Sequence, residues 1–288
     1  MKTQSVFEND QELNRLATQN RLLRECEEPF YRRFFNGYHQ LRLLDLGCND
    51  GSKTVDRFDV PEIRKVVGLE IQEELAHRAQ MRYGSEKFSF YAGNVEAPDF
   101  QGNLEQIMER EGVEAFDIIS ASFVLMHLKN PIALLKGLRR FLAPGGRIVI
   151  EEADDASSGL TPDADQLFRQ FLQMLETDPW AGNRRCGEHV AGWMEQCGYR
   201  QVIQHPGTVR AGGEQTERKR DMFETFFSYL PLDMEILCRE EPDNRDYAAC
   251  VEWLRQHYEG LRAAAMSEGT EIAVGIRLIA GEGGERTP

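Results

Sequence analysis

The residues best suited to bind a ligand stand in a short stretch, 45–51, that reads DLGCNDG. An apolar run precedes Asp45, and a pattern of helical length follows Gly51. In a doubly wound sheet, ligands lie outside the carboxyl ends of the strands, where such a strand, turn and helix meet. Gly47 would let the backbone approach a ligand closely, and Gly51 would permit close contact between helix and strand. The stretch therefore predicts a small-molecule site.

The same stretch lacks the pattern of a dinucleotide-binding loop. That fingerprint needs three glycines in the order G-x-G-x-x-G, whereas this chain has Asn49 in the second place and Ser52 in the last. The chain also has no phosphate-binding P-loop motif. We therefore expect a ligand without a pyrophosphate, which argues against a nicotinamide-linked enzyme.

The elements that position this stretch are alternating strands and helices. Short apolar runs and segments of helical length follow one another from residue 41 to residue 151. We expect strands at 41–46, 66–71, 88–92, 116–121 and 147–151, and helices at 52–59, 72–83, 101–111 and 130–142. This order predicts an α/β fold with parallel strands, right-handed helical crossovers and helices on both faces of the sheet.

The flanking segments read mainly as helices. An apolar face runs through 8–38, with Pro29 expected to divide two helices. After residue 153 we expect helices at 163–177 and 187–197, a strand at 199–204, helix-like patterns through 206–268 and a last strand at 271–280. The expected organisation is an N-terminal helical lid (1–40), a Rossmann-like core (41–205), a helical cap insertion (206–270) and a closing strand with a tail (271–288).

The chain resembles the class I S-adenosylmethionine-dependent methyltransferases of small-molecule type. The family's first motif reads acid-x-Gly-x-Gly-x-Gly, matched here by Asp45, Gly47 and Gly51, with Asn49 replacing the middle glycine. Asn is the non-glycine residue that best tolerates left-handed backbone angles, so the loop can keep its shape. The fourth strand and the LAPGG turn at 142–146 also match. The resemblance is close over 41–153 and looser over 184–204 and 271–281.

The resemblance implies a doubly wound, mostly parallel sheet of seven strands, whose closing strand lies antiparallel at the edge. It also implies S-adenosylmethionine as the cofactor and S-adenosylhomocysteine as the product. In the family, an acid at Glu70 holds the ribose hydroxyls, Ile71 packs on the adenine, and Asn94 bonds the adenine amino group beside the Val95 backbone. The implied cofactor set is Asp45, Gly47, Cys48, Asn49, Gly51, Glu70, Ile71, Asn94, Val95, Ser120 and Ala121.

The expected reaction is in-line displacement of the methyl group by an oxygen, nitrogen, carbon or sulfur atom of a small acceptor. Two residues are candidate general bases, His127 and Tyr31, although a histidine at this place in the family is often structural. Trp180 and Arg184 could bind an acidic substrate, or Arg184 could pair with acids of the C-terminal half. The alternatives are an RNA or protein methyltransferase and a non-catalytic protein that binds the cofactor.

Four acids at 151–155 leave open a magnesium site of the kind found in catechol-type O-methyltransferases. Such a site also needs an acid at the end of the fourth strand, where this chain has Ser120 and Ser122. We therefore expect a solvated loop here and no metal. Six scattered cysteines lack zinc-site spacing, which indicates free thiols in a reducing compartment.

The charge of the chain bears on its partners. The net charge is −14, and residues 154–288 carry 14 basic against 24 acidic side chains. Because phosphate contacts supply most nucleic-acid affinity, this balance argues against DNA or RNA as a partner. No apolar run approaches membrane-spanning length, and the polar N-terminus lacks a signal-peptide pattern. We expect a cytoplasmic monomer or homodimer that acts on a small molecule.

Overall fold

The structure is a computed structural model that describes residues 10–283. These residues form two compact units. The sheet unit contains 27–153, 186–205 and 277–283, and the helical unit contains 10–26, 154–185 and 206–276. The N-terminal stretch interpreted above as lacking a signal peptide lies largely outside the described residues. Among the described residues, no helix is long and apolar enough to cross a membrane.

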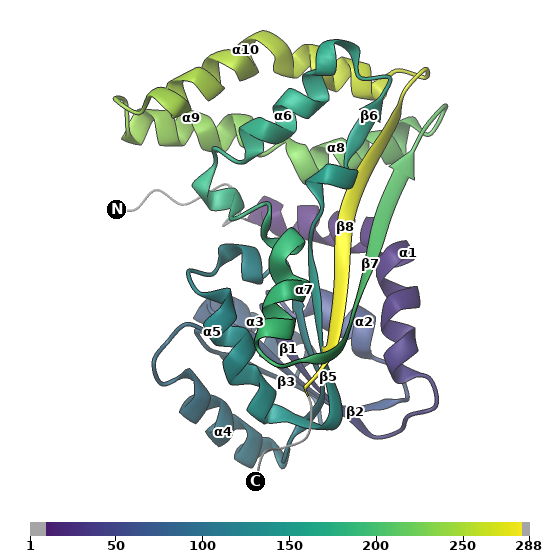
Figure 1. Ribbon diagram of the computed structural model, residues 1–288, viewed down its shortest axis with the longest axis vertical. Coiled ribbons are helices and arrows are strands. Elements are labelled where there is room, and N and C mark those ends of the chain that lie inside the picture. The colour runs from purple at the N-terminus through teal and green to yellow at the C-terminus, as the bar shows by residue number, and fades with distance from the viewer. Residues whose placement is uncertain (1–9, 284–288) are drawn as a thin grey trace. The chain divides into compact units, whose positions relative to one another are not determined.

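The sheet unit is built on five parallel strands, which confirms the predicted α/β fold (Figure 1). The strands are β1 (Leu41–Leu46), β2 (Ile63–Glu70), β3 (Phe88–Ala92), β4 (Phe116–Ser122) and β5 (Leu142–Ala153). Their order in the sheet is β3-β2-β1-β4-β5. Because the order reverses at β1, the carboxyl ends of β1 and β4 flank the switch point at which open α/β sheets bind ligands.

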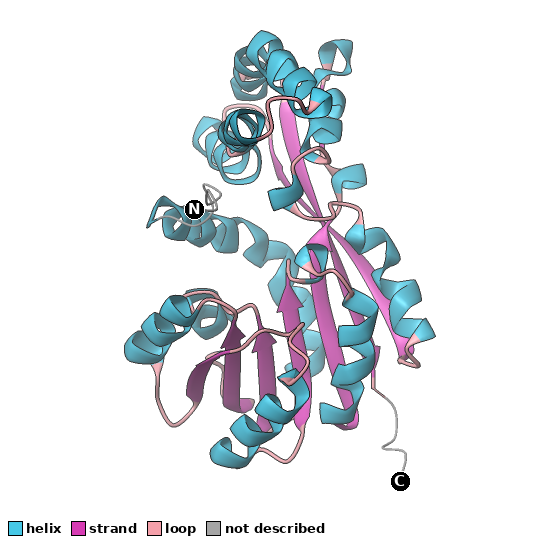
Figure 2. Ribbon diagram, turned by 90° about the vertical axis from the view of Figure 1, so that its left-hand side faces the viewer, coloured by secondary structure: helices cyan, strands magenta, loops and turns pink. Residues whose placement is uncertain are grey.

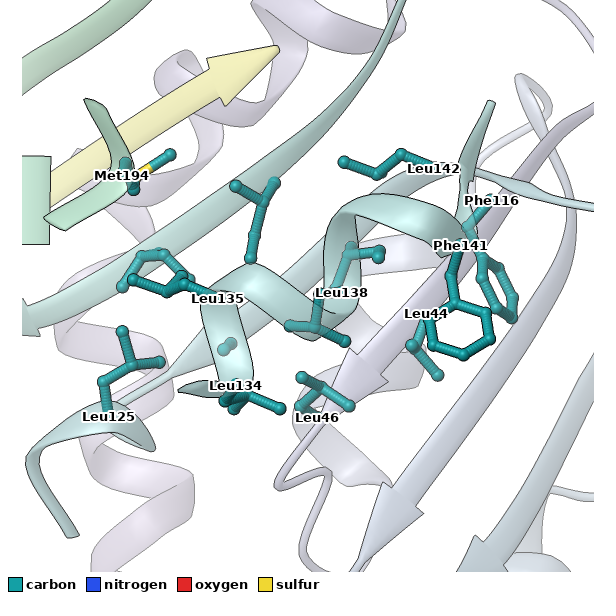
Figure 3. Close-up of a cluster of buried hydrophobic side chains, with 14 of the residues drawn as sticks. Leu44, Leu46, Phe116, Leu125, Leu134, Leu135, Leu138, Phe141, Leu142 and Met194 are labelled. Carbon is teal, nitrogen blue, oxygen red and sulfur yellow. The ribbon is translucent and has the colours of Figure 1, made fainter. Parts of the chain in front are cut away.

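Helices cover both faces of this sheet (Figure 2). They are α2 (Ser52–Phe58), α3 (Glu73–Tyr83), α4 (Phe100–Glu111), α5 (Pro131–Leu138) and α7 (Cys186–Gln196). An apolar core lies between the strands and helices α4, α5 and α7, and includes Leu44, Leu135 and Met194 (Figure 3). Each helix buries one apolar face on the sheet, and that face appears in the sequence as apolar residues at helical spacing. The alternation of strands and helices could therefore be recognised from the sequence.

The helical unit contains most of the C-terminal half. Its elements include β6 (Gly159–Thr161), α6 (Leu167–Leu175), α8 (Thr216–Phe227), α9 (Leu230–Glu240) and α10 (Arg245–Met266). Its core is aromatic: the rings of Phe168, Phe171 and Phe223 all lie within about 6 Å of the Phe227 ring. Two long strands, β7 (Arg200–Ala211) and β8 (Glu271–Glu282), contribute residues to both units.

The closing strand does not lie at the edge of the sheet, where it was predicted. β8 pairs with β6 and β7 and neighbours β5, so it lies inside the sheet and not at its edge. Its nearly continuous buried run, IAVGIRLIAG, is typical of an interior strand. The sheet also has eight strands where seven were expected, because β6 adds a short antiparallel strand.

The N-terminal segment is one helix, α1 (Asp10–Phe35), with Pro29 inside it. The prediction that Pro29 divides two helices is therefore wrong. Proline removes one backbone hydrogen bond, but Phe30, Tyr31 and Phe35 just after it are fully or almost fully buried, and this burial favours a continued helix.

The boundary between the units also differs from the expected ranges. Residues 154–185, placed above in a core of 41–205, belong to the helical unit together with 206–276. α1 is shared, because residues 10–26 belong to the helical unit and 27–35 to the sheet unit. All six cysteines are free thiols, as expected.

Candidate functional site

The loop after β1 has the backbone conformation that its residue types predict. Gly47, Asn49 and Gly51 have φ angles of 68°, 50° and 78°, all in the left-handed region. Asn49 is thus accommodated in the place of the family's middle glycine. The amide of Gly47 donates to the Leu69 carbonyl at 2.8 Å, which ties the loop to β2. The loop therefore lies at the carboxyl ends of β1 and β2.

Gly47 is required by space as well as by its backbone angle. A Cβ atom there would lie 2.6 Å from Cγ2 of Val124, which follows β4. We expect Gly47→Ala to lower the free energy of unfolding by about 1–3 kcal/mol through strain and overpacking. Urea unfolding checks this. Gly145→Ala is the matched control, because Gly145 has φ 74° but a Cβ atom there would meet open space, so equal losses would contradict the contact argument.

Glu70 ends β2 and braces the loop. Its Oε2 accepts from the backbone N–H of Asn49 at 2.9 Å, and its Oε1 accepts from that of Gln72 at 3.0 Å. Only 6% of the residue is exposed. Each carboxylate oxygen can accept a second hydrogen bond, so the group keeps capacity for a ligand's hydroxyl groups.

The residues after β2 and β3 fit a nucleoside. Ile71 is 65% exposed, although large apolar side chains are normally buried, so it offers a face for a ring. Asn94 is exposed, and its Oδ1 accepts from the Glu96 amide at 2.9 Å, which fixes its side chain while leaving its NH2 group accessible. Val95 beside it is half-buried. With Glu70, these residues fit the ribose and adenine of S-adenosylmethionine.

Three of the predicted cofactor residues have buried side chains: Asp45 in β1, Ser120 in β4 and Cys48 in the loop itself. Asp45 Oδ2 accepts from Thr54 Oγ1 at 2.6 Å, and burial raises the pKa of Asp45. Ser120 and Cys48 are almost fully buried, and burial raises the pKa of the Cys48 thiol well above its usual value. Asp45 thus bonds the first helical turn after the loop, and Ser120 bonds Tyr31 Oη at 2.9 Å. Ala121, which is also buried, could offer a ligand only its backbone.

A set of buried polar and charged side chains lies in the sheet unit next to these supports. We call it the buried charge cluster; it consists of Glu27, Tyr31, Lys53, Arg57, Ser122 and Glu151. Arg57, on α2, is at its centre: it pairs with Glu27 and with Glu151, and donates to Tyr31 Oη at 3.1 Å and to Ser122 Oγ at 3.0 Å.

Tyr31 belongs to this cluster, and this placement corrects its prediction as a catalytic residue. It is 1% exposed, its hydroxyl is bonded to Ser120 Oγ at 2.9 Å, and Arg57 lies over its ring. Burial raises the pKa of Tyr31. A buried and hydrogen-bonded phenol with a raised pKa is poorly suited to take a proton from an acceptor. His127 is exposed, in a short 3-10 helix (Leu125–His127) after β4.

The acids at 151–155 are not a solvated loop, so that interpretation is wrong. Glu151 and Glu152 are fully buried and Asp154 is 4% exposed. They are buried because β5 is longer than predicted and runs to Ala153 in the sheet interior. Glu152 Oε1 accepts from the Leu125 amide at 2.9 Å. No group of three metal-ligating side chains occurs among residues 10–283.

The two predicted substrate residues lie in the helical unit. Arg184 donates two hydrogen bonds to Asp155, from Nε to Oδ2 at 2.8 Å and from Nη2 to Oδ1 at 2.5 Å. Its Nη1 lies 3.4 Å from Tyr229 Oη. This arrangement matches the alternative in which Arg184 pairs with an acid of the C-terminal half. Trp180 is half-buried, and its amide donates to Asp178 Oδ1 at 2.8 Å.

Sequence reasoning missed the charged residues of the cluster that come from the helices, which are Glu27, Lys53 and Arg57. Glu27 and Tyr31 are four residues apart on α1, and Lys53 and Arg57 are four apart on α2. Side chains at this spacing share one helix face. A signal for the cluster was therefore present in the sequence: charged residues stand on helix faces that also carry apolar aromatic residues, which indicates that these charges are buried.

Comparison with known proteins is consistent with this geometry. A family described as "Methyltransferase domain" matches residues 7–204, more than half of the chain. An uncharacterized methyltransferase of Schizosaccharomyces pombe is 27% identical over 167 residues, 55% of this chain and 56% of that protein. A demethylmenaquinone methyltransferase of Lactococcus lactis is 29% identical over 44% of this chain and 48% of that protein.

A further relative matches a shorter part of the chain, and a solved structure matches most of it. A tRNA U34 carboxymethyltransferase of Hydrogenovibrio crunogenus is 31% identical over 34% of this chain and 28% of that protein. The chain thus spans about half, or less, of the curated relatives it matches. Among solved structures, the YcgJ protein of Bacillus subtilis has a TM-score of 0.53 at 14% identity, over 91% of this chain and 99% of that one. This likeness shows the fold.

Proposed function

We propose that this chain, which belongs to the class I S-adenosylmethionine-dependent methyltransferase family, methylates a small-molecule acceptor. The observation that carries the proposal is the loop at 47–51, with three left-handed residues braced by the Glu70 carboxylate. When bound, S-adenosylmethionine supplies an electrophilic methyl group. The chain itself then has to bind the cofactor, align the acceptor and exclude water.

We assign the cofactor contacts to residues at one edge of the sheet. Glu70 would accept hydrogen bonds from the ribose hydroxyls, which a charged carboxylate binds more strongly than a neutral group does. Ile71 would pack on the adenine, and Asn94 with the Val95 backbone would bond its polar edge. The backbone of Gly47, Cys48, Asn49 and Gly51 would line the remaining part of the cofactor, its methionine end. Asp45, Ser120 and Ala121, at the ends of β1 and β4, would support this loop.

His127 is the one predicted general base that we keep. It is exposed and lies just beyond the end of β4, next to the switch point of the sheet. A neutral imidazole there could take a proton from an acceptor that has to lose one. An acceptor without such a proton would need only alignment, and His127 would then serve to position the loop.

The charge distribution supports a small acceptor over a nucleic acid. The chain carries −14 overall, and a net negative charge disfavours association with a polyanion. The relatives cover both classes, since one is a demethylmenaquinone methyltransferase and another a tRNA U34 carboxymethyltransferase. For this chain we favour the small molecule because of its acidity.

Transfer of a labelled methyl group tests the proposal. The protein would be incubated with methyl-labelled S-adenosylmethionine and, separately, with a small-metabolite extract, total tRNA and a protein extract. We expect label in the metabolite fraction, reduced when S-adenosylhomocysteine is added. Label in tRNA or protein alone would replace the small-molecule assignment. Cofactor binding without any transfer would favour a non-catalytic binding protein.

A further inference from the structure

The hydrogen bonds to Glu151 are unevenly divided between its two oxygens. Oε2 accepts from Ser122 Oγ at 2.7 Å and lies 3.2 Å from both Lys53 Nζ and Arg57 Nη2. Oε1 is fully buried, and no residue in the described part of the chain donates a hydrogen bond to it. An ionised carboxylate accepts through both oxygens, whereas a carboxylic acid accepts through its carbonyl and donates through its hydroxyl. A hydroxyl group at Oε1 would account for this uneven division.

The partner for such a hydroxyl is Glu27. Its carboxyl group lies beside that of Glu151, because Lys53 Nζ and Arg57 Nη2 each pair with both groups. Glu27 itself has the environment of an ionised group, because Oε2 pairs with Arg57 and Oε1 lies 2.9 Å from Lys53 Nζ. Two ionised carboxylates in contact repel each other, so one proton between them turns repulsion into a hydrogen bond.

The charge balance of the surroundings supports the same conclusion. The charged groups that act on Glu151 are Lys53 and Arg57 from α2 and Glu27 from α1. Tyr31 from α1 is neutral, and burial raises the pKa of Asp45 on β1. Glu27 already pairs with both cations, through Oε1 with Lys53 and through Oε2 with Arg57, so Glu151 on β5 shares cations that Glu27 has neutralised in part. Burial, and then the charge of Glu27, raise the pKa of Glu151 to about 7.

We propose that Glu151 is a carboxylic acid whose Oε1–H donates to Glu27, and that this proton fastens the Glu27–Phe35 segment of α1 to the sheet. Loss of the proton leaves two adjacent buried carboxylates and loosens the segment. Since Lys53 and Arg57 stand on the helix that follows the 47–51 loop, the same proton tunes cofactor affinity; this last step rests on the proposed function.

The pH dependence of unfolding tests the proton without any cofactor. A raised native pKa means a contribution to stability that is present below the unfolded value, 4.5, and is lost as pH rises to about 7. Glu151→Gln keeps one acceptor and one donor but cannot ionise. We expect the unfolding equilibrium constant of the wild type, relative to E151Q, to rise about tenfold per pH unit across this interval.

Glu28→Gln is the matched control on the same helix, because Glu28 is paired with Arg32 at the surface. Its pH profile should follow the wild type. Parallel profiles for wild type and E151Q would overturn the proposal. So would failure of E151Q to fold, since glutamine reproduces the hydrogen-bonding pattern of the acid.

Infrared spectroscopy provides an independent test on the wild type. At pH 6 we expect the carbonyl band of a protonated carboxylic acid, absent from E151Q and lost from the wild type as pH rises. Absence of that band would overturn the proposal. Calorimetry with S-adenosylhomocysteine tests the cofactor step: affinity should fall with pH in the wild type relative to E151Q. A constant ratio would remove only that step, and absence of binding to both would contradict the proposed function.

Discussion

Replacing Arg57 with alanine is expected to lower the free energy of unfolding by about 3–5 kcal/mol, the range for removing one partner of a buried ion pair. The Arg57 side chain is 9% exposed and pairs with two almost fully buried carboxyl groups, of Glu27 and Glu151. The change also removes the donors to Tyr31 and Ser122. Glu27 would then be stabilised by Lys53 alone.

Chemical denaturation of the two proteins at neutral pH checks this expectation. Arg32→Ala is the control, because Arg32 makes a surface pair with Glu28 one helical turn away and is about half exposed. Such pairs contribute about 0–1 kcal/mol. Losses of similar size in R57A and R32A would contradict the account of the buried charge cluster.

Replacing Glu70 with alanine is expected to weaken binding of S-adenosylmethionine by about 1.5–3 kcal/mol, the range for hydrogen bonds to a charged group. The variant loses the proposed ribose acceptor. It also loses the acceptor for the amides of Asn49 and Gln72, so the loop is held less firmly. Both effects act in the same direction.

Titration calorimetry measures the change, with urea unfolding of the same samples to separate loss of binding from loss of fold. Glu73→Ala, an exposed acid three residues further on in the first turn of α3, should bind as the wild type does. An unchanged affinity in E70A would remove Glu70 from the site.

The backbone conformation of the 47–51 loop could be predicted from sequence because its determinants are local. Left-handed backbone angles at 47, 49 and 51 demand glycine or asparagine, and the chain supplies them directly after an apolar strand. Glu70 and Asn94 follow their strands in the same way. Their placement needs only the rule that parallel strands end at one edge of the sheet.

The buried charge cluster could not be predicted, because its members come from two helices and two strands far apart in the chain. Each charged residue taken alone is typical of a solvated surface, and burial follows only when the partners meet. The same limit explains the acids at 151–155. The predicted helix break at Pro29 and the predicted edge position of β8 are wrong for a related reason. Packing against residues distant in sequence decides where a helix ends and where a strand lies in the sheet.

A crystal structure of the protein with S-adenosylhomocysteine tests the central claim most directly. We predict the ribose hydroxyls within hydrogen-bond distance of the Glu70 carboxylate, the adenine against Ile71 and the amino-acid end along the 47–51 loop. A ligand bound elsewhere, or a ribose turned away from Glu70, would contradict it.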